Sequence, residues 1–418
     1  MRNGPFWWIL IVAMILIDLY VFFSIRSLFV SGTKSRAIFT IAYWAFSAIA
    51  LILLIFVLPY FQASEQHKAL RSILFVLVFA LFLGKLIGAL FFFIDDLRRA
   101  VQWIAGKIFS PNNEISEIAG ATTNRISRSS FLTWLGIISG GSMFASFIYG
   151  LNNKYNYQVK NIKIPFANLP SAFKGFKIVH ISDIHTGSFT NLNAVNRGID
   201  LILSQKPDLI LFTGDLVNNK SDEVGEYQKI FSRLKAPMGV YSVLGNHDYG
   251  DYVNWKTPAE KADNLESLKK IHANMGWRLL LDEHLPLEKD NATIGLLGVQ
   301  NISGRGSFHS YGSLAKAMQG AGNYPFKILM SHDPSHWDTE VSTKYTDVDL
   351  TLSGHTHGMQ FGVEIPGFKW SPVQYVYKHW AGLYEQQQQK LYVNRGFGFI
   401  GYPGRVGILP EITVIELA

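Results

Sequence analysis

The stretch VDLTLSGHTHG, Val348 to Gly358, joins a strand-like segment directly to a pair of histidines. Its first seven residues are rich in apolar and β-branched side chains, which is typical of a strand in the interior of a sheet. His355 and His357 follow where this strand is expected to end, and Gly354 and Gly358 flank them. Because glycine adds no side-chain bulk, the pattern predicts a tight turn that leaves the two imidazoles accessible.

Four other predicted strands end in the same way, each followed by side chains of types that bind metal ions. The strands are expected at Phe176–Ser182, Leu209–Gly214, Val240–Gly245 and Phe326–Ser331. The residues that follow them are Asp183, His185, Asp215, Asn246, His247, Asp248 and His332. Helical stretches lie between several of these strands, as in α/β domains, where ligands gather at the carboxyl ends of the strands. The sequence therefore predicts one site built from five strand ends.

Each of these residues alone has an ordinary explanation, since Asp and Asn are common in turns and a single histidine after a strand is usually a surface residue. Their joint occurrence at five strand ends makes coincidence a poor explanation. The chain has no cysteine, so any metal must be held by oxygen and nitrogen atoms. Two divalent cations about 3.5–4 Å apart can clamp the attacking and leaving oxygens of a phosphoryl displacement, and such a pair needs mixed carboxylate and imidazole ligands.

The series Asp-x-His, Gly-Asp, Gly-Asn-His-Asp, His and Gly-His-x-His, in this order, resembles the calcineurin-like metallophosphoesterase superfamily over about residues 173–418. The segments LPSAFKGFKIVHISDIHTGSF and LYVNRGFGFIGYPGRVGILPEITVIEL further resemble its branch of membrane-attached or exported bacterial phosphohydrolases. The resemblance implies two packed mixed β-sheets flanked by helices, a four-layer sandwich. It also implies an enzyme that cleaves a phosphoester or pyrophosphate bond by attack of a metal-bound hydroxide.

The same resemblance implies a role for each site residue. The ligands of a first metal ion would be Asp183, His185, Asp215 and His357, with Asp215 bridging to a second ion held by Asn246, His332 and His355. His247 would lie near the leaving-group oxygen as a general acid or transition-state stabiliser, and Asp248 would orient it. Two divalent ions are expected. Mn, Fe, Zn and Mg all accept these ligands, although several histidines favour transition metals over Mg.

Four further residues are candidates for binding the substrate. Arg305 and His309 lie in a loop rich in glycine and serine, and Arg395 and Arg405 lie in glycine-rich C-terminal segments. A guanidinium can grip a phosphate through two parallel hydrogen bonds. The alternative for the first two residues is a plain surface loop, and the alternative for the two C-terminal arginines is local structural pairing.

The first 151 residues differ in kind from the rest of the chain. Apolar stretches at about 6–25, 38–61, 73–94 and 131–151 are each long enough to cross a hydrocarbon core as a helix, for which roughly 20 residues are needed. The sequence thus predicts an all-α bundle of four transmembrane helices over 1–151, followed by the phosphoesterase domain over 155–418. Asp18 and Lys85 lie inside these stretches. They either pair within the bundle or have a function of their own.

Lysines and arginines in the loops predict an orientation. Eight lie in the first and third loops and six on the opposite side, so the positive-inside rule places these two loops in the cytoplasm and the phosphoesterase domain outside it. The formal charge of +7 is spread thinly, without the basic block typical of nucleic-acid-binding proteins. The expected partners are therefore the lipid bilayer and a phosphate-containing substrate, with no nucleic acid.

Three functional hypotheses stay open at this point. The first is a membrane-anchored, binuclear metal-dependent phosphohydrolase, with a lipid-linked substrate as one option. The second is a phosphatase or nucleotidase that acts on soluble substrates. The third is a membrane sensor or transporter with an inactive phosphoesterase-like module. The complete ligand set argues against the third hypothesis, because an inactive module would be expected to have lost ligands.

Overall fold

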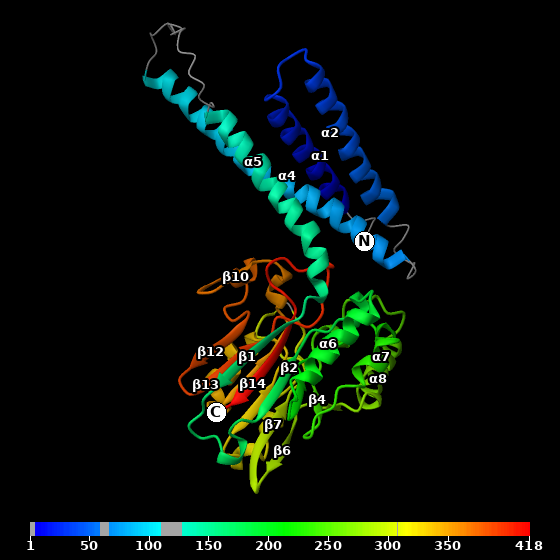
Figure 1. Ribbon diagram of the computed structural model, residues 1–418, viewed down its shortest axis with the longest axis vertical. Helices are drawn as coiled ribbons and strands as arrows, with labels where there is room; N and C mark the ends of the chain where they lie inside the picture. The colour runs from blue at the N-terminus through cyan, green and yellow to red at the C-terminus, as the bar shows by residue number, and fades with distance from the viewer. Residues whose placement is uncertain (1–4, 59–66, 110–127, 307) are drawn as a thin grey trace. The chain divides into compact units, whose positions relative to one another are not determined.

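The computed structural model describes residues 5–58, 67–109, 128–306 and 308–418 (Figure 1). The chain separates into two compact units, Met1–Tyr149 and Gly150–Ala418. The first unit is helical in its described residues, and the second contains all the β-strands that the structure describes.

The helical unit contains the four predicted apolar helices. They are α1 (Pro5–Arg26), α2 (Lys34–Ile52), which continues as the π-helical segment η1 (Leu53–Val57), α4 (Lys68–Phe109) and α5 (Arg128–Gly150). By length and composition, the segments that can span a membrane are Trp8–Arg26, Lys34–Val57, Ala69–Ile108 and Ser129–Tyr155. With 42 residues, α4 extends well beyond the predicted 73–94 segment. The end of the predicted second stretch lies outside the described residues. So do two of the basic residues counted for the orientation, Arg125 in the third loop and Arg2 on the opposite side.

Close helix packing and a buried ion pair organise the interior of this unit. A Cβ at Gly84 would lie 2.7 Å from the Gly140 carbonyl oxygen, and one at Gly88 would lie 3.2 Å from that of Gly136. Glycines four residues apart on α4 and α5 therefore let these helices approach closely. Lys85 forms an ion pair with Asp18, which is 1% exposed. Lys85 Nζ also donates to Ser47 Oγ at 2.8 Å. Asp18 and Lys85 were expected either to pair within the bundle or to have a function of their own, and the structure shows that they pair.

Two six-stranded mixed sheets form the centre of the second unit. The first has the order β1-β14-β2-β3-β4-β5 and the second β12-β13-β9-β8-β7-β6. Their bounds are β1 Gln158–Ile164, β2 Lys177–Ile181, β3 Leu209–Phe212, β4 Val240–Ser242, β5 Arg278–Leu279, β6 Glu283–Lys289, β7 Ala292–Gly298, β8 Lys327–Met330, β9 Leu350–Ser353, β12 Gly382–Gln386, β13 Gln389–Val393 and β14 Glu411–Leu417. A separate antiparallel pair consists of β10 (Val363–Ile365) and β11 (Phe368–Trp370).

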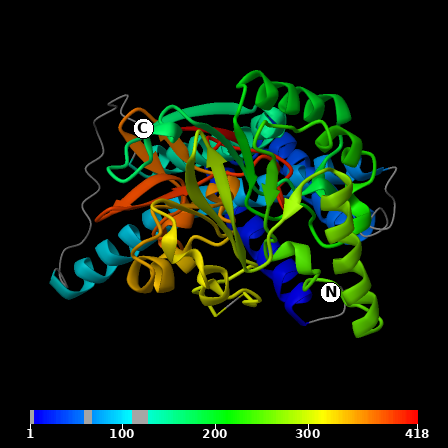
Figure 2. The same cartoon turned by 90° about the horizontal axis from the view of Figure 1, so that it is seen from below.

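The sheets lie face to face and helical segments cover their outer faces. Successive side chains of a strand point to opposite faces, so β3 contributes Leu209 and Leu211 to a core between the sheets, and Ile210 and Phe212 to a core beneath α6 (Leu192–Ser204), α7 (Tyr227–Phe231) and α8 (Pro258–Asn274). A third core lies under α9 (Leu314–Met318) and η10 (Trp337–Val341). Figure 2 shows the green helices on one side of the strands and the yellow and orange segments on the other. The predicted fold class is confirmed.

This topology brings the candidate residues to one edge. Strands β2, β3 and β4 run parallel in one sheet, and β8 and β9 run parallel in the other. Parallel strands end at the same edge of a sheet, and the candidate residues occupy the loops that follow these five strands.

Candidate metal centre

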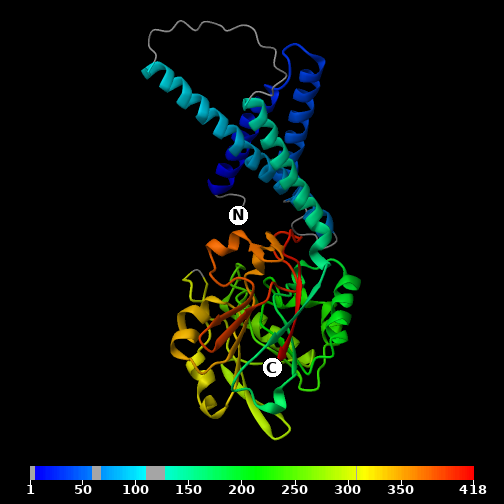
Figure 3. The same cartoon turned by 60° about the vertical axis from the view of Figure 1, so that its left-hand side comes forward.

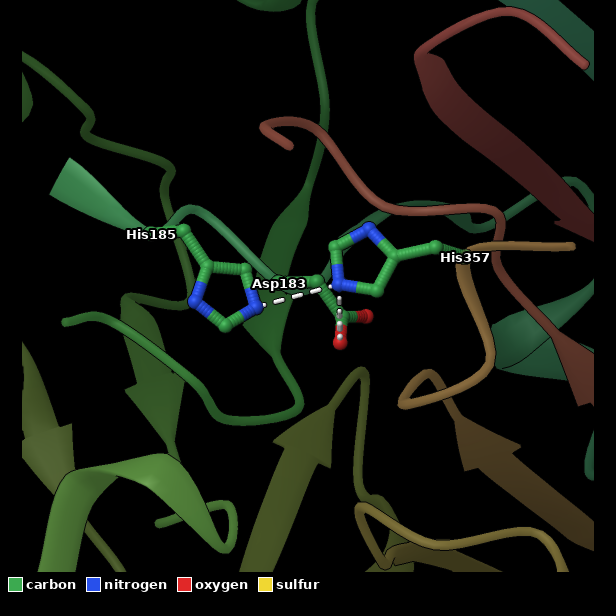
Figure 4. A group of neighbouring side chains, drawn as sticks. All are labelled: Asp183, His185 and His357. Atoms are coloured by element: carbon green, nitrogen blue, oxygen red, sulfur yellow. Dashed lines mark hydrogen bonds and ion pairs between the residues drawn. The ribbon is translucent and has the colours of Figure 1, made fainter. Parts of the chain in front are cut away.

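Asp183, His185 and His357 form the first of two groups of converging ligand atoms, which lie within 4.8 Å of one another. The Nε2 atoms of His185 and His357 are 3.0 Å apart, and His357 Nε2 lies 3.3 Å from Asp183 Oδ1. Figure 4 shows the two imidazoles facing each other with the Asp183 carboxylate beside them. All three side chains are buried, so water does not compete freely for these atoms.

Asp215, His332 and His355 form the second group, at which Asn246 also points. His332 Nε2 lies 3.1 Å from Asp215 Oδ2 and 3.2 Å from His355 Nδ1, and Asn246 Oδ1 lies 2.8 Å from that same Nδ1 atom. The Oδ2 atom of Asp215 is also 3.6 Å from His185 Nε2 in the first group. One carboxylate is therefore within reach of both groups.

Backbone carbonyls set the direction of two of these imidazoles. Nδ1 of His185 lies 3.2 Å from the carbonyl oxygen of Val217, and Nδ1 of His332 lies 2.8 Å from that of Thr213. A carbonyl only accepts, so Nδ1 carries the proton and the lone pair of a neutral ring is on Nε2, facing the cluster. This arrangement is the one that a metal-binding histidine needs.

The loops that carry the candidate ligands hold an uncommon backbone conformation. Asp183, His185, Asp215, His355 and His357 all have positive φ, between 50° and 70°. Residues with a Cβ rarely adopt this left-handed region, and such strain concentrates at functional sites where surrounding structure enforces it.

Asp248 provides that enforcement for the Asp215 loop. Its carboxylate, which is fully buried, accepts hydrogen bonds from the backbone N–H groups of Asp215, Leu216, Val217 and Gly245 at 2.8–3.3 Å. The prediction that Asp248 orients the His247 ring is wrong, because Asn218 does so instead. His247 Nδ1 donates to the carbonyl oxygen of Asn218 at 2.7 Å, and the ring faces the cavity described below.

The charges of the site depend on one another. Burial raises the pKa of Asp183 to about 6 and lowers the pKa of His185 to about 3. Burial alone would also lower the pKa of His332, but the neighbouring Asp215 carboxylate raises it to about 10. Buried carboxylates thus need positive charge nearby, and divalent cations between these oxygen and nitrogen atoms would supply it. The residues present fit bound metal.

A cavity of about 370 Å³ opens onto both ligand groups. Its polar wall consists of His185, Asp215, Asn246, His247, His355 and His357. The other lining residues include the apolar side chains Phe308, Met359, Val376 and Ile400, and the Phe308 ring centre lies 4.8 Å from that of His355. The cavity therefore offers both metal-ligand side chains and apolar contacts to whatever occupies it.

Arg305 lines this cavity and has donors to spare. Its guanidinium lies 5.0 Å from the centre of the Tyr377 ring and donates to the carbonyl oxygen of Val376. A guanidinium has five N–H donors, so others are available to an anion in the cavity. Tyr377 itself places its hydroxyl 2.8 Å from His355 Nε2. The sequence carried no signal for Tyr377, which lies in an irregular segment far from the histidine motif.

The other three candidates for substrate binding lie elsewhere. The part of the chain that the structure describes lines the cavity with Phe308 but not with His309, which is exposed. Arg395 pairs with buried Glu411 and with Glu364. Arg405 is fully buried and donates to the carbonyl oxygens of Arg395 at 2.7 Å and of His357 at 3.2 Å. Both guanidiniums therefore hold loops of the site in place.

Arg395→Ala is expected to lower the free energy of unfolding by about 3–5 kcal/mol, because it leaves the Glu411 carboxylate buried without its partner. Chemical denaturation of the detergent-solubilised chain measures this loss, and Arg197→Ala, an exposed arginine on α6, is the matched control. An unchanged stability together with a raised KM would instead make Arg395 a substrate contact.

Comparison with known proteins agrees with this geometry. Residues 1–154 match the family model described as "Probable Calcineurin-like phosphoesterase, transmembrane domain", and residues 176–359 match "Calcineurin-like phosphoesterase". The uncharacterized metallophosphoesterase YkuE of Bacillus subtilis is 30% identical over 300 residues, which cover 70% of this chain and 98% of YkuE. The chain belongs to the calcineurin-like metallophosphoesterase family.

Two further relatives have names that state an activity. Phosphodiesterase YaeI of Escherichia coli is 28% identical over 245 residues, or 58% of this chain and 82% of YaeI. UDP-2,3-diacylglucosamine pyrophosphatase LpxG of Chlamydia trachomatis is 29% identical over 274 residues, or 55% of this chain and 81% of LpxG. This metallophosphoesterase is a hydrolase of phosphoester bonds from a family that uses divalent metals, and it is a multi-pass membrane protein.

Proposed function

We propose that this metallophosphoesterase holds two divalent metal ions and hydrolyses a phosphoester or pyrophosphate bond of a lipid-linked substrate on the extracytoplasmic side of the membrane. The observation that carries the proposal is the position of Asp215. Its Oδ2 atom lies 3.1 Å from His332 and 3.6 Å from His185, between the two ligand groups. When bound, the ions would polarise the phosphoryl oxygens and activate the attacking water.

Different side chains would bind the metal ions, donate a proton and bind the phosphate. Asp183, His185 and His357 would hold one ion and Asn246, His332 and His355 the other, with Asp215 shared. His247 faces the cavity with its Nδ1 committed to Asn218, so its Nε2 is the atom available to give a proton to the leaving oxygen. Arg305, which lines the cavity beside Tyr377, would bind the phosphate.

Three observations support a lipid-linked substrate. The apolar side chains that line the cavity suit a substrate that carries an apolar group next to its phosphate. The last segment that can span a membrane ends at Tyr155, and β1 begins at Gln158. No long linker therefore separates this segment from the first strand of the second unit (Gly150–Ala418), which we call the catalytic unit. The name of the relative LpxG describes a pyrophosphatase of a diacylated compound.

A panel of substrates tests the reaction. The detergent-solubilised chain, stripped with a chelator and reloaded with Mn, Zn or Mg, is assayed on p-nitrophenyl phosphate, bis-p-nitrophenyl phosphate, nucleotides and pyrophosphate-linked lipids. We expect metal-dependent turnover that is fastest on the lipids. Preference for nucleotides would support a soluble substrate and overturn the lipid part of the proposal. Bound metal without turnover on any of them would indicate an inactive module.

Arg305→Ala is expected to raise KM about tenfold, or ~1.4 kcal/mol, because it removes a charged donor to the phosphate. kcat is expected to change less, since Arg305 is not among the candidate metal ligands. Steady-state kinetics on bis-p-nitrophenyl phosphate measures both constants, and Arg197→Ala again provides the control. An unchanged KM would remove Arg305 from the substrate site.

The proposed orientation predicts that the catalytic unit is labelled from outside the cell. The chain has no cysteine, so Glu288→Cys, at an exposed position on β6, introduces the single thiol. We expect a membrane-impermeant maleimide to label this variant in intact cells. Labelling that appears only after the cells are lysed would place the catalytic unit in the cytoplasm.

A further inference from the structure

The β10–β11 hairpin carries apolar side chains where a surface hairpin is usually polar. Ile365 and Phe368 flank its Pro366–Gly367 turn and are 58% and 54% exposed, and Val363 is 43% exposed. Among the residues that the structure describes, the two strands pair only with each other and lie outside both six-stranded sheets. Contiguous exposed apolar side chains of this kind mark surfaces that contact a partner or a membrane.

The apolar surface continues from this hairpin to the mouth of the catalytic cavity. Trp370 at the end of β11 lies beside Tyr375, with 3.4 Å between the indole Nε1 and the hydroxyl oxygen. Tyr375 is 77% exposed, and the adjacent Val376 is 45% exposed and lines the cavity. Tryptophan and tyrosine are the side chains enriched where a protein meets the polar boundary of a bilayer.

The charges around the hairpin suit a lipid surface. Its one carboxylate, Glu364, is 23% exposed in its side chain and is held by Lys160 Nζ at 3.3 Å and Arg395 Nη2 at 2.9 Å. The hairpin therefore presents no unpaired negative charge to lipid phosphates. Lys378, which follows the cavity-lining Tyr377 in the chain, is exposed and adds a positive charge in this segment.

Within the second unit, its first residue Gly150 is linked to this hairpin by backbone hydrogen bonds through residues 405 and 406. The backbone N–H of Arg405 donates to the carbonyl oxygen of Gly150, the last residue of α5, at 2.9 Å. The next residue, Val406, accepts a hydrogen bond at 2.9 Å from the N–H of Gly362, which directly precedes β10. Figures 1 and 3 both show the orange hairpin and the red loop near residue 400 at the same end of the catalytic unit.

We propose that the β10–β11 hairpin inserts Ile365 and Phe368 into the lipid bilayer and holds the mouth of the catalytic cavity at the membrane surface. We choose the lipid bilayer as the partner of this hairpin because Gly150, to which the hairpin is linked, lies within the candidate membrane span Ser129–Tyr155. A substrate with an apolar tail then passes from the bilayer to the cavity along apolar side chains. The inference concerns membrane contact and holds whichever bond the enzyme cleaves.

Single thiols in the full-length chain test this contact directly. Because the natural chain has no cysteine, Ile365→Cys, Phe368→Cys and the control Glu288→Cys each carry one label. β6, which carries Glu288, lies at the end of the catalytic unit away from β10 (Figure 1). Each variant is labelled with a polarity-sensitive fluorophore and reconstituted into phosphatidylcholine–phosphatidylglycerol vesicles with or without lipids that carry a nitroxide on the acyl chain. Turnover of bis-p-nitrophenyl phosphate confirms that each variant is folded.

We expect the emission at positions 365 and 368 to shift to the blue in vesicles, and nitroxide lipids to quench it at least severalfold more strongly than at position 288. Equal quenching at all three positions overturns the proposal, because the hairpin would then be no closer to lipid than the control site. A blue shift without lipid quenching also overturns it, since a second copy of the chain or another part of this one would then cover the hairpin.

Discussion

Asp215→Asn is expected to abolish hydrolysis and metal binding together. The substitution keeps the volume of a side chain that is 1% exposed, but removes the negative charge that lies within 3.6 Å of both ligand groups. Loss of a residue that merely supports a ligand weakens metal binding about 10–100-fold, so loss of the shared ligand is expected to exceed about 100-fold. Turnover should fall by about 1,000-fold or more, equivalent to ~4 kcal/mol.

Asp263→Asn is the matched control for this variant, because it makes the same chemical change at an exposed position on α8. Both proteins are compared by circular dichroism, by metal content after gel filtration and by turnover. The asparagine amide oxygen can still accept the hydrogen bond from the backbone N–H of His247, so the fold should persist. Full metal content and full turnover in Asp215→Asn would refute the shared-carboxylate proposal.

His247→Gln is expected to lower kcat by about 10²–10⁴-fold while the metal content stays unchanged. His247 lines the cavity, and its Nδ1 is committed to the Asn218 carbonyl oxygen, which leaves Nε2 to act on the substrate. Glutamine can keep a hydrogen bond to Asn218 but has no group that gives up a proton near neutral pH. KM should change little, because the phosphate is bound by other side chains.

The control for this variant is His309→Gln, which makes the same change at an exposed histidine. The described cavity lining includes its neighbour Phe308 but not His309. Metal analysis decides between two roles for His247. A parallel loss of metal and turnover would make it a ligand. Unchanged kcat would exclude it from proton transfer.

The sequence predicted the central strands well because they are buried on both faces. β2, β3, β8 and β9 consist mainly of apolar and β-branched residues, and each is followed by metal-ligand side chains. The edge strands β1 and β6 were missed. β1 contains Lys160, Asn161 and Lys163, and β6 contains Pro286, which an edge position tolerates. Strands at the edge of a sheet are less buried, so they lack the apolar pattern from which the central strands were predicted.

Within the candidate site, the motifs identified residues by type, and the structure supplied their directions. Asp248 follows His247 in the chain, yet its carboxylate turns toward the N–H groups of the Asp215 loop. Arg395 and Arg405 stand in glycine-rich segments that resemble phosphate-binding loops. Their partners, Glu411 and several backbone carbonyls, are brought to them only by the packing of β14 and the C-terminal loops. Such pairings depend on tertiary contacts that no local pattern encodes.

Metal stoichiometry tests the two-ion proposal most directly. The purified full-length chain, loaded with Mn or Zn and freed of excess metal, is measured by elemental mass spectrometry beside Asp215→Asn, with turnover of bis-p-nitrophenyl phosphate recorded on the same samples. The proposal predicts about two ions per active wild-type chain and well below one in the variant. One ion per chain at full activity, or a variant that keeps both ions, would contradict it.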